Sequence, residues 1–148
     1  MPFKNTKANM SKKRRIYYNN KRVSKGEHSI IKILNKNNIT FESEKSFTNC
    51  RSPKNRLLRF DFYLPKYNLL IEYQGHHHYQ PINKYKRARI THEKTKIHDE
   101  IKRQYSINNN ISLLAIHYKD FKIVEEIIIV FLYGEKINGQ EKINGSVG

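Results

Sequence analysis

The chain has 148 residues, of which 37% are hydrophobic, and it carries ten Tyr, seven Phe and a formal net charge of +16. This length supports one domain with a modest core, and the hydrophobic content argues against a wholly disordered protein. The charge predicts a polyanionic partner, nucleic acid above all, because Lys and Arg that neutralise phosphates release condensed counterions. A solubilising surface or a Lys-rich coding bias would produce the same composition.

Cysteine content and hydropathy indicate the compartment. Cys50 is the only cysteine, so the chain forms no internal disulfide, which fits a reducing environment. No apolar run has the length of a membrane span, and no signal peptide is visible. We therefore expect a soluble, cytoplasmic protein.

The first 23 residues are polar and basic, and we expect them to form a flexible arm that lies along DNA. Tyr17 and Tyr18 follow its basic run and are available for stacking. An unstructured tail or a nuclear localisation signal has the same pattern. The candidate phosphate contacts in the arm are Lys12, Lys13, Arg14 and Arg15.

The first predicted helix covers residues 24–38. Ser24 can cap it, and apolar residues recur behind it at helical spacing. Glu27 shares the face of these apolar residues. It is therefore either an acid that serves a site or a first-turn Glu stabilised by the helix dipole.

A strand is expected next, over residues 39–47, where apolar and polar residues alternate. A basic loop containing Pro53 follows over residues 48–56. In this loop Arg51 and Lys54 are candidates for phosphate contacts beside a site, although such loops are often only solvated.

Two strand patterns separated by a short turn then predict an antiparallel hairpin, with strands at residues 59–64 and 69–74. Alternation places Phe60, Phe62 and Leu64 on one face of the first strand and Asp61 on the other. Asp61 and Glu72 can then lie opposite each other. Two carboxylates this close repel unless a cation neutralises them, so the pair suggests a Mg²⁺ or Mn²⁺ site.

Three histidines, His76, His77 and His78, follow the hairpin. On an extended chain they point alternately to opposite faces, so they do not form one zinc site. A basic loop is expected over residues 79–89, and its candidate phosphate contacts are Lys84, Lys86, Arg87 and Arg89.

The rest of the chain predicts a helix over 90–107, a strand over 111–118 and a last helix over 121–133. The strand is nearly all apolar, which favours a central position in a mixed sheet. Asp120 is expected to cap the last helix and Gly134 to close it. Residues 134–148 repeat Glu-Lys-Ile-Asn-Gly and are expected to be a loose tail, which leaves one domain over 24–133.

The order Phe-Asp-Phe, a turn, and Ile-Glu-Tyr-x-Gly-x-x-His at residues 60–78 resembles the catalytic hairpin of the PD-(D/E)XK nuclease superfamily. The most similar branch contains the very-short-patch repair (Vsr-like) endonucleases and the EDxHD homing endonucleases of phages and large DNA viruses. The resemblance covers roughly residues 24–133. It implies an α/β, restriction-endonuclease-like core, with a mixed β-sheet and a catalytic antiparallel hairpin flanked by helices.

The resemblance also implies a role for each matching residue. Asp61 and Glu72 would hold Mg²⁺, with Mn²⁺ as a substitute, and Gln74 stands where the superfamily often carries Lys. The further residues that the resemblance brings to the site are Glu27, His78, Asp99 and Lys102. A surface ion pair would explain Asp99 and Lys102 equally well.

The implied function is a metal-dependent endodeoxyribonuclease that hydrolyses phosphodiester bonds in duplex or branched DNA, with a homing, repair or resolvase role, as a monomer or a homodimer. Gln74 keeps a second interpretation open, a catalytically inactive DNA-binding protein on the same fold. A nuclease for RNA and a structural basic protein are further alternatives, although the structural protein would leave two strand-borne acids unexplained.

Overall fold

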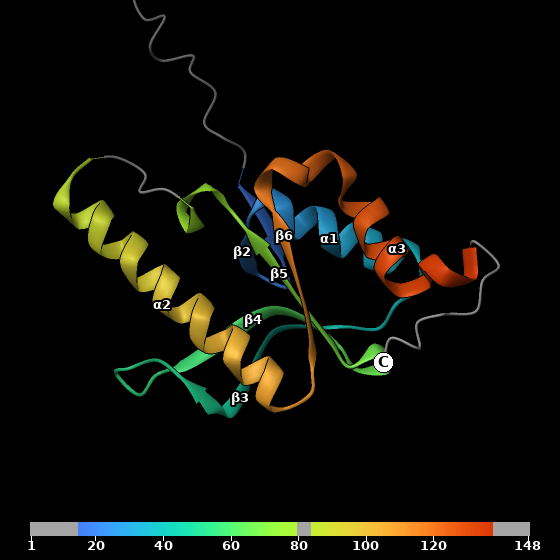
Figure 1. Ribbon diagram of the computed structural model, residues 1–148. Helices are drawn as coiled ribbons and strands as arrows, with labels where there is room; N and C mark the ends of the chain where they lie inside the picture. The colour runs from blue at the N-terminus through green and yellow to red at the C-terminus, as the bar shows by residue number, and fades with distance from the viewer. Residues whose placement is uncertain (1–14, 80–83, 138–148) are drawn as a thin grey trace, which may run out of the picture.

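The computed structural model describes residues 15–79 and 84–137. It has an α/β architecture in which a mixed four-stranded sheet is flanked by helices, as predicted (Figure 1). The sheet has the order β3-β4-β5-β6, with antiparallel β3-β4 and β4-β5 pairs and a parallel β5-β6 pair. Its strands are β3 (Glu42–Arg51), β4 (Leu57–Leu64), β5 (Leu69–Gln74) and β6 (Ser112–His117).

Helices cover both faces of this sheet. The helices α1 (Lys25–Lys36) and α3 (Val124–Ile137) contribute to one hydrophobic cluster, which includes Ile71 of β5. The long helix α2 (Lys86–Asn108) packs against a second cluster, which includes Leu70. Successive residues of β5 thus face opposite layers, as a pleated strand requires.

Strand β4 does not keep this alternation. Leu58 and Phe60 belong to the cluster beneath α2, whereas Phe62 and Leu64 belong to the cluster beneath α1 and α3. The predicted single apolar face for Phe60, Phe62 and Leu64 is therefore wrong. The strand thus changes face at Asp61, between the apolar residues that face α2 and those that face α1 and α3.

Helix α1 begins at a complete capping box. The Glu27 backbone amide donates to Ser24 Oγ at 3.1 Å, and the Ser24 amide donates to Glu27 Oε2 at 2.7 Å. These bonds satisfy orphan donors of the first turn and fix where the helix starts. The prediction of this helix and its cap is confirmed.

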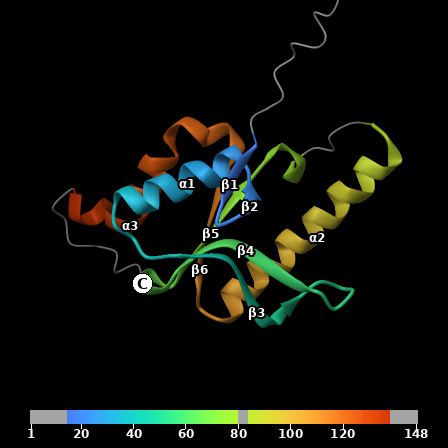
Figure 2. The same cartoon turned by 180° about the vertical axis from the view of Figure 1, so that it is seen from behind.

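Residues 16–23 differ from the predicted arm. They form the antiparallel strands β1 (Ile16–Tyr18) and β2 (Lys21–Val23), joined by Asn19 and Asn20. Both asparagines have positive φ, 48° and 63°, the backbone of a tight hairpin turn. Figure 2 shows this hairpin beside the N-terminal end of α1, where Tyr18 and Val23 contact the core.

The central hairpin agrees closely with the prediction. Leu64 pairs with Leu69 and Phe62 with Ile71, and the connection is a single 3₁₀ turn, Pro65–Tyr67. Asn68 closes this turn with φ 47°. Strand β3, in contrast, extends through the segment expected to be a loop, so the β3-β4 connection is shorter than predicted and the strand starts later.

Three other expectations are corrected. Strand β6 pairs with β5 alone among the described residues, so it is an edge strand and not a central one. Helix α2 starts at Lys86, four residues earlier than expected, and its first half extends past the sheet (Figure 1), where Ile90 remains 47% exposed. The basic residues at 86–89 therefore lie on a helix.

The last helix also differs. A 3₁₀ segment, Tyr118–Ile123, precedes α3 and contains Asp120, which therefore does not cap α3, and α3 continues past Gly134. Val130 and Phe131 are 62% and 49% exposed, so the helix is less buried than its composition suggested. Within the described residues, no helix is both long enough and apolar enough to cross a membrane.

Candidate active site

The two strand-borne acids meet where β4 changes face. The Asp61 amide donates to Glu72 Oε1 at 3.2 Å, and the Tyr73 amide donates to Asp61 Oδ2 at 2.7 Å. Each carboxylate thus accepts a bond from the opposite strand. These side-chain bonds take the place of backbone hydrogen bonds between β4 and β5, whose regular pairing ends at Phe62 and Ile71. They also fix the positions of both acids.

Burial makes this pair electrostatically costly. Glu72 is only 5% exposed and Asp61 is half-buried. Burial, and then the neighbouring Glu72 carboxylate, raise the pKa of Asp61 well above its usual range. Burial also raises the pKa of Glu72, against the opposing charge of Lys102. In this protein the pair therefore needs a nearby positive charge to stay ionised.

Helix α2 supplies one such charge. Lys102 Nζ donates to Glu72 Oε1 at 3.0 Å, and the Lys102 side chain is 14% exposed. The sequence placed Lys102 near the site only through the family resemblance, and the structure shows that it contacts the second acid. It lies over the Phe60 ring, 5.4 Å from the centroid, which holds its stem in the layer beneath α2.

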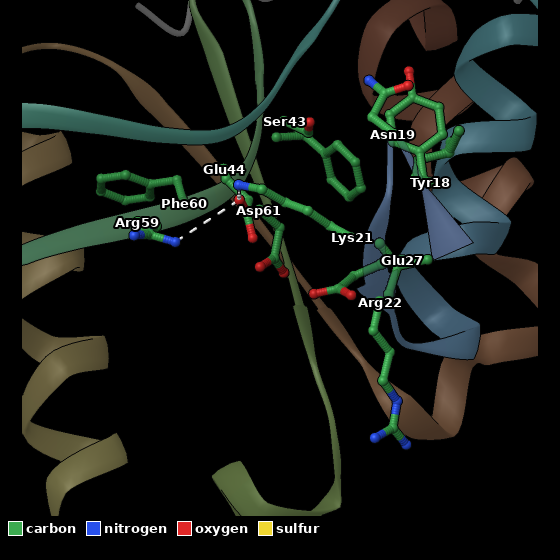
Figure 3. Close-up of a pocket in the computed structure, with 13 residues that line it drawn as sticks. Tyr18, Asn19, Lys21, Arg22, Glu27, Ser43, Glu44, Arg59, Phe60 and Asp61 are labelled. Atoms are coloured by element: carbon green, nitrogen blue, oxygen red, sulfur yellow. Dashed lines mark hydrogen bonds and ion pairs between the residues drawn. The ribbon is translucent and has the colours of Figure 1, made fainter. Parts of the chain in front are cut away.

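A cleft of about 380 Å³ opens on the other side of Asp61. In Figure 3 the carboxylates of Asp61 and Glu27 point toward one another across it. Glu27 thus serves two purposes, since one of its oxygens closes the capping box while its charge raises the pKa of Asp61. Both interpretations of Glu27 from the sequence are compatible with this placement.

Basic side chains from two strands line the same cleft. Lys21 and Arg22 come from β2, and Arg59 comes from β4. Glu44, which has φ 53°, forms ion pairs with Lys21 and Arg59. This set was not predicted from the sequence, because the pattern of residues 16–23 is that of a basic arm. The two asparagines between two short β patterns were the signal that could have revealed the hairpin.

A second pair lies at the C-terminal end of β5. His78 Nδ1 is 2.8 Å from Asp99 Oδ2, and their side chains are 13% and 25% exposed. A carboxylate on one ring nitrogen fixes the orientation of the imidazole. Gln74 accepts a hydrogen bond from the Tyr79 hydroxyl, so its side chain is held by a neighbouring tyrosine.

The donor set fits a hard divalent cation held by two carboxylates. Oδ1 of Asp61 and Oε2 of Glu72 accept no hydrogen bond from the described residues, so one oxygen of each acid remains available. In the described part of the chain, no three His, Cys, Asp or Glu residues come close enough to form a ligand set. Two protein carboxylates completed by water and substrate phosphate are the usual Mg²⁺ arrangement.

The predicted phosphate contacts have different surroundings. Arg51 is engaged locally, because its guanidinium donates to the Thr48 and Asn55 carbonyls. Lys12, Lys13 and Arg14 lie outside the described residues. The remaining candidates are exposed at the surface, namely Arg15, Lys54, Lys84, Lys86, Arg87 and Arg89.

Comparisons with protein-family models, with curated proteins and with solved structures found no match for this chain.

Proposed function

We propose that this protein is a metal-dependent DNA endonuclease with a restriction-endonuclease-like core, of the PD-(D/E)XK superfamily and similar to its very-short-patch repair and EDxHD branch. The observation that supports this most is the Asp61–Glu72 pair. Two desolvated acids on adjacent strands, each leaving one oxygen available, carry a high electrostatic cost. Such costs are typical of functional sites.

In the proposed site, Asp61 and Glu72 hold Mg²⁺, or Mn²⁺ in its place. The bound ion supplies Lewis acidity toward the scissile phosphate and a lowered pKa for a coordinated water. Lys102 favours the ionised form of Glu72, and it supplies the positive charge that a Lys in place of Gln74 would provide. Glu27 adds negative charge across the cleft from Asp61.

His78 is the proton-transfer group in this proposal. Its contact with Asp99 fixes the ring, so that the imidazole accepts a proton from a water or donates one to the leaving oxygen. Lys21, Arg22 and Arg59 line the cleft beside Asp61 and attract the DNA backbone. A polyanionic substrate also accounts for the net charge of +16.

The test is cleavage of supercoiled plasmid and of a four-way junction with Mg²⁺, with Mn²⁺ and with EDTA. We expect cutting with either metal, none with EDTA, and a loss of at least about a hundredfold in Asp61→Asn, since removal of a metal carboxylate disables the centre. Glu100→Gln is the matched control, because Glu100 is exposed and, within the described residues, bonds only Arg103 and Gln104 on the same helix. Equal cutting by Asp61→Asn and the wild type would refute this site.

The alternative is a DNA-binding protein without catalysis. Its support is the Lys102–Glu72 ion pair, which already neutralises one acid without a metal, together with Gln74 in place of Lys. Salt-sensitive binding without cleavage under either metal would favour it. Gln74→Lys would then be the first substitution to test for restored cutting.

A further inference from the structure

A second basic groove lies apart from the acidic cleft, between the tip of the β3-β4 hairpin and the middle of α2. Its volume is about 350 Å³. Three of its side chains are cations and none is acidic. The lining residues are Ser52, Pro53, Lys54, Arg56, Lys94, Ile97 and His98.

The hairpin side of the groove is held by hydrogen bonds within its turn. The Ser52 amide donates to the Arg56 carbonyl and the Asn55 amide to the Ser52 carbonyl, each at 2.8 Å. The Arg51 guanidinium bonds two further carbonyls of the same turn, those of Thr48 and Asn55. Arg51 therefore braces the tip, and Lys54 and Arg56 project from a fixed backbone, which lowers the entropic cost of binding a ligand.

The helix side combines charge with an apolar wall. Ile97 is 48% exposed beside Lys94 and His98. The pKa of His98 is lowered, first by burial and then by the charges of Lys102 and Lys94, against Asp99. A groove with cations on both walls and no carboxylate among its lining residues has a positive potential, which favours binding of an anion.

The distance between the groove and the acids is compatible with a DNA backbone as the bound anion. From Lys94 to Lys102, which contacts Glu72, is eight residues along α2, or about 12 Å at 1.5 Å per residue. One strand of a duplex rises about 3.4 Å per nucleotide along the duplex axis, and its phosphates are further apart than this because the strand also winds around the axis. The groove is therefore within about four nucleotides of the acidic pair.

We propose that this groove binds a backbone phosphate of the DNA, within about four nucleotides of the scissile bond. This inference rests on the proposed nuclease function. The cleft lined by Lys21, Arg22 and Arg59 provides cations on another side of Asp61. The DNA backbone thus passes across the acids and continues into the groove, so the substrate needs nucleotides beyond the cleaved bond.

The first experiment measures binding of a 30-base-pair duplex against salt concentration, in the Asp61→Asn background so that no cleavage interferes. Lys54→Ala with Lys94→Ala is the test pair. Lys32→Ala with Lys66→Ala is the control pair, because both are exposed lysines away from the groove and the net charge changes equally. We expect the test pair to reduce the slope of log K against log salt by about 1 to 2, and the control pair by much less.

The second experiment locates the contact with neutral methylphosphonate linkages, placed one at a time along a cleavable duplex. The wild type should lose about tenfold in affinity when the neutral linkage is at one position within about four nucleotides of the cut. The Lys54→Ala, Lys94→Ala protein should not respond at that position and should respond normally elsewhere.

The outcomes separate the two proposals. Equal slopes in the test and control pairs, alongside intact cleavage, would refute the groove and leave the nuclease standing. A reduced slope only in the test pair, without cleavage under any metal, would support the groove as a DNA contact and refute the nuclease. Sensitivity to a neutral linkage that persists in the test pair would also refute the groove.

Discussion

Among single residues, the two acids of the candidate site are buried next to each other, which is unfavourable while both are ionised. Asp61 and Glu72 are both largely removed from water and lie close together. Burial, and then the charge of Glu72, raise the pKa of Asp61. Tyr73 donates to only one Asp61 oxygen, so an amide of the same shape keeps that bond. Neutralising Asp61 should therefore remove repulsion without removing a contact.

We predict that Asp61→Asn raises the free energy of unfolding of the metal-free protein by about 1 kcal/mol at pH 7. The raised pKa means that the folded wild type takes up a proton before the unfolded chain does, so wild-type stability rises as pH falls and the gain shrinks. Thermal unfolding in EDTA at pH 7 and at pH 5 measures both effects. A destabilised Asp61→Asn at neutral pH would contradict this account.

The His78–Asp99 contact makes a second prediction at this scale. If Asp99 acts by positioning the His78 ring, Asp99→Asn and His78→Ala should each reduce the cleavage rate by about 10²- to 10⁴-fold, the range of general acid–base catalysis. The double variant should be no worse than His78→Ala alone, because both remove one function. Single-turnover cleavage of all three proteins tests this, and multiplicative losses would show that the residues act separately.

At the scale of elements, the packing of α1 against β5 depends on a glycine. A Cβ at Gly26 would lie 2.1 Å from the Tyr73 ring, closer than any real contact. Gly26 is followed by Glu27, which faces Asp61 across the cleft. The close approach of helix and strand therefore also sets the position of the third acid.

We predict that Gly26→Ala destabilises the protein by about 1 to 3 kcal/mol, the usual cost of overpacking. Helix propensity alone predicts the opposite sign, because Ala is favoured over Gly inside a helix by about 1 kcal/mol. Chemical denaturation distinguishes the two. Ser29→Ala, one turn further along the same helix, is the control.

The elements also show what the sequence could reveal. Local chemistry determines the α1 cap and the turn between β4 and β5, so Ser24, Glu27 and the turn that ends at Asn68 were predictable. The change of face at Asp61 was not, because it depends on the strands on both sides. The near-apolar run of β6 did not distinguish a central strand from an edge strand covered by helices.

At the scale of the whole molecule, the candidate site is assembled from distant segments. Lys102 and Glu72 are 30 residues apart and Lys21 and Glu44 are 23 apart. Alternation and helical spacing describe only neighbours, so the contacts of Lys102 and His78 could be anticipated only through a resemblance. The cations of β2, which no resemblance supplied, were missed.

The basic N-terminal segment provides a prediction at this scale. Deleting residues 2–14 removes five Lys and Arg. We expect weaker DNA binding and a shallower salt dependence, because fewer phosphates are neutralised, with little change in the cleavage rate of substrate already bound. Binding titrations at two salt concentrations and single-turnover cleavage measure the two effects, and an unchanged salt slope would exclude a role for these charges.

The left-handed turns of the protein are made almost entirely by asparagine. Among the described residues, six of the seven non-glycine positions with positive φ are asparagine, namely Asn19, Asn20, Asn38, Asn55, Asn68 and Asn110. Glycine is the residue that takes this backbone without steric cost, and asparagine is the next most tolerant. Asparagine codons begin with two adenines and glycine codons with two guanines, so a coding sequence poor in G and C meets the demand for tight turns with asparagine. Exchanging these asparagines for glycine would relieve backbone strain at the turns, but at Asn68 it would also remove the side-chain hydrogen bonds to Tyr63 and to the Asn110 carbonyl.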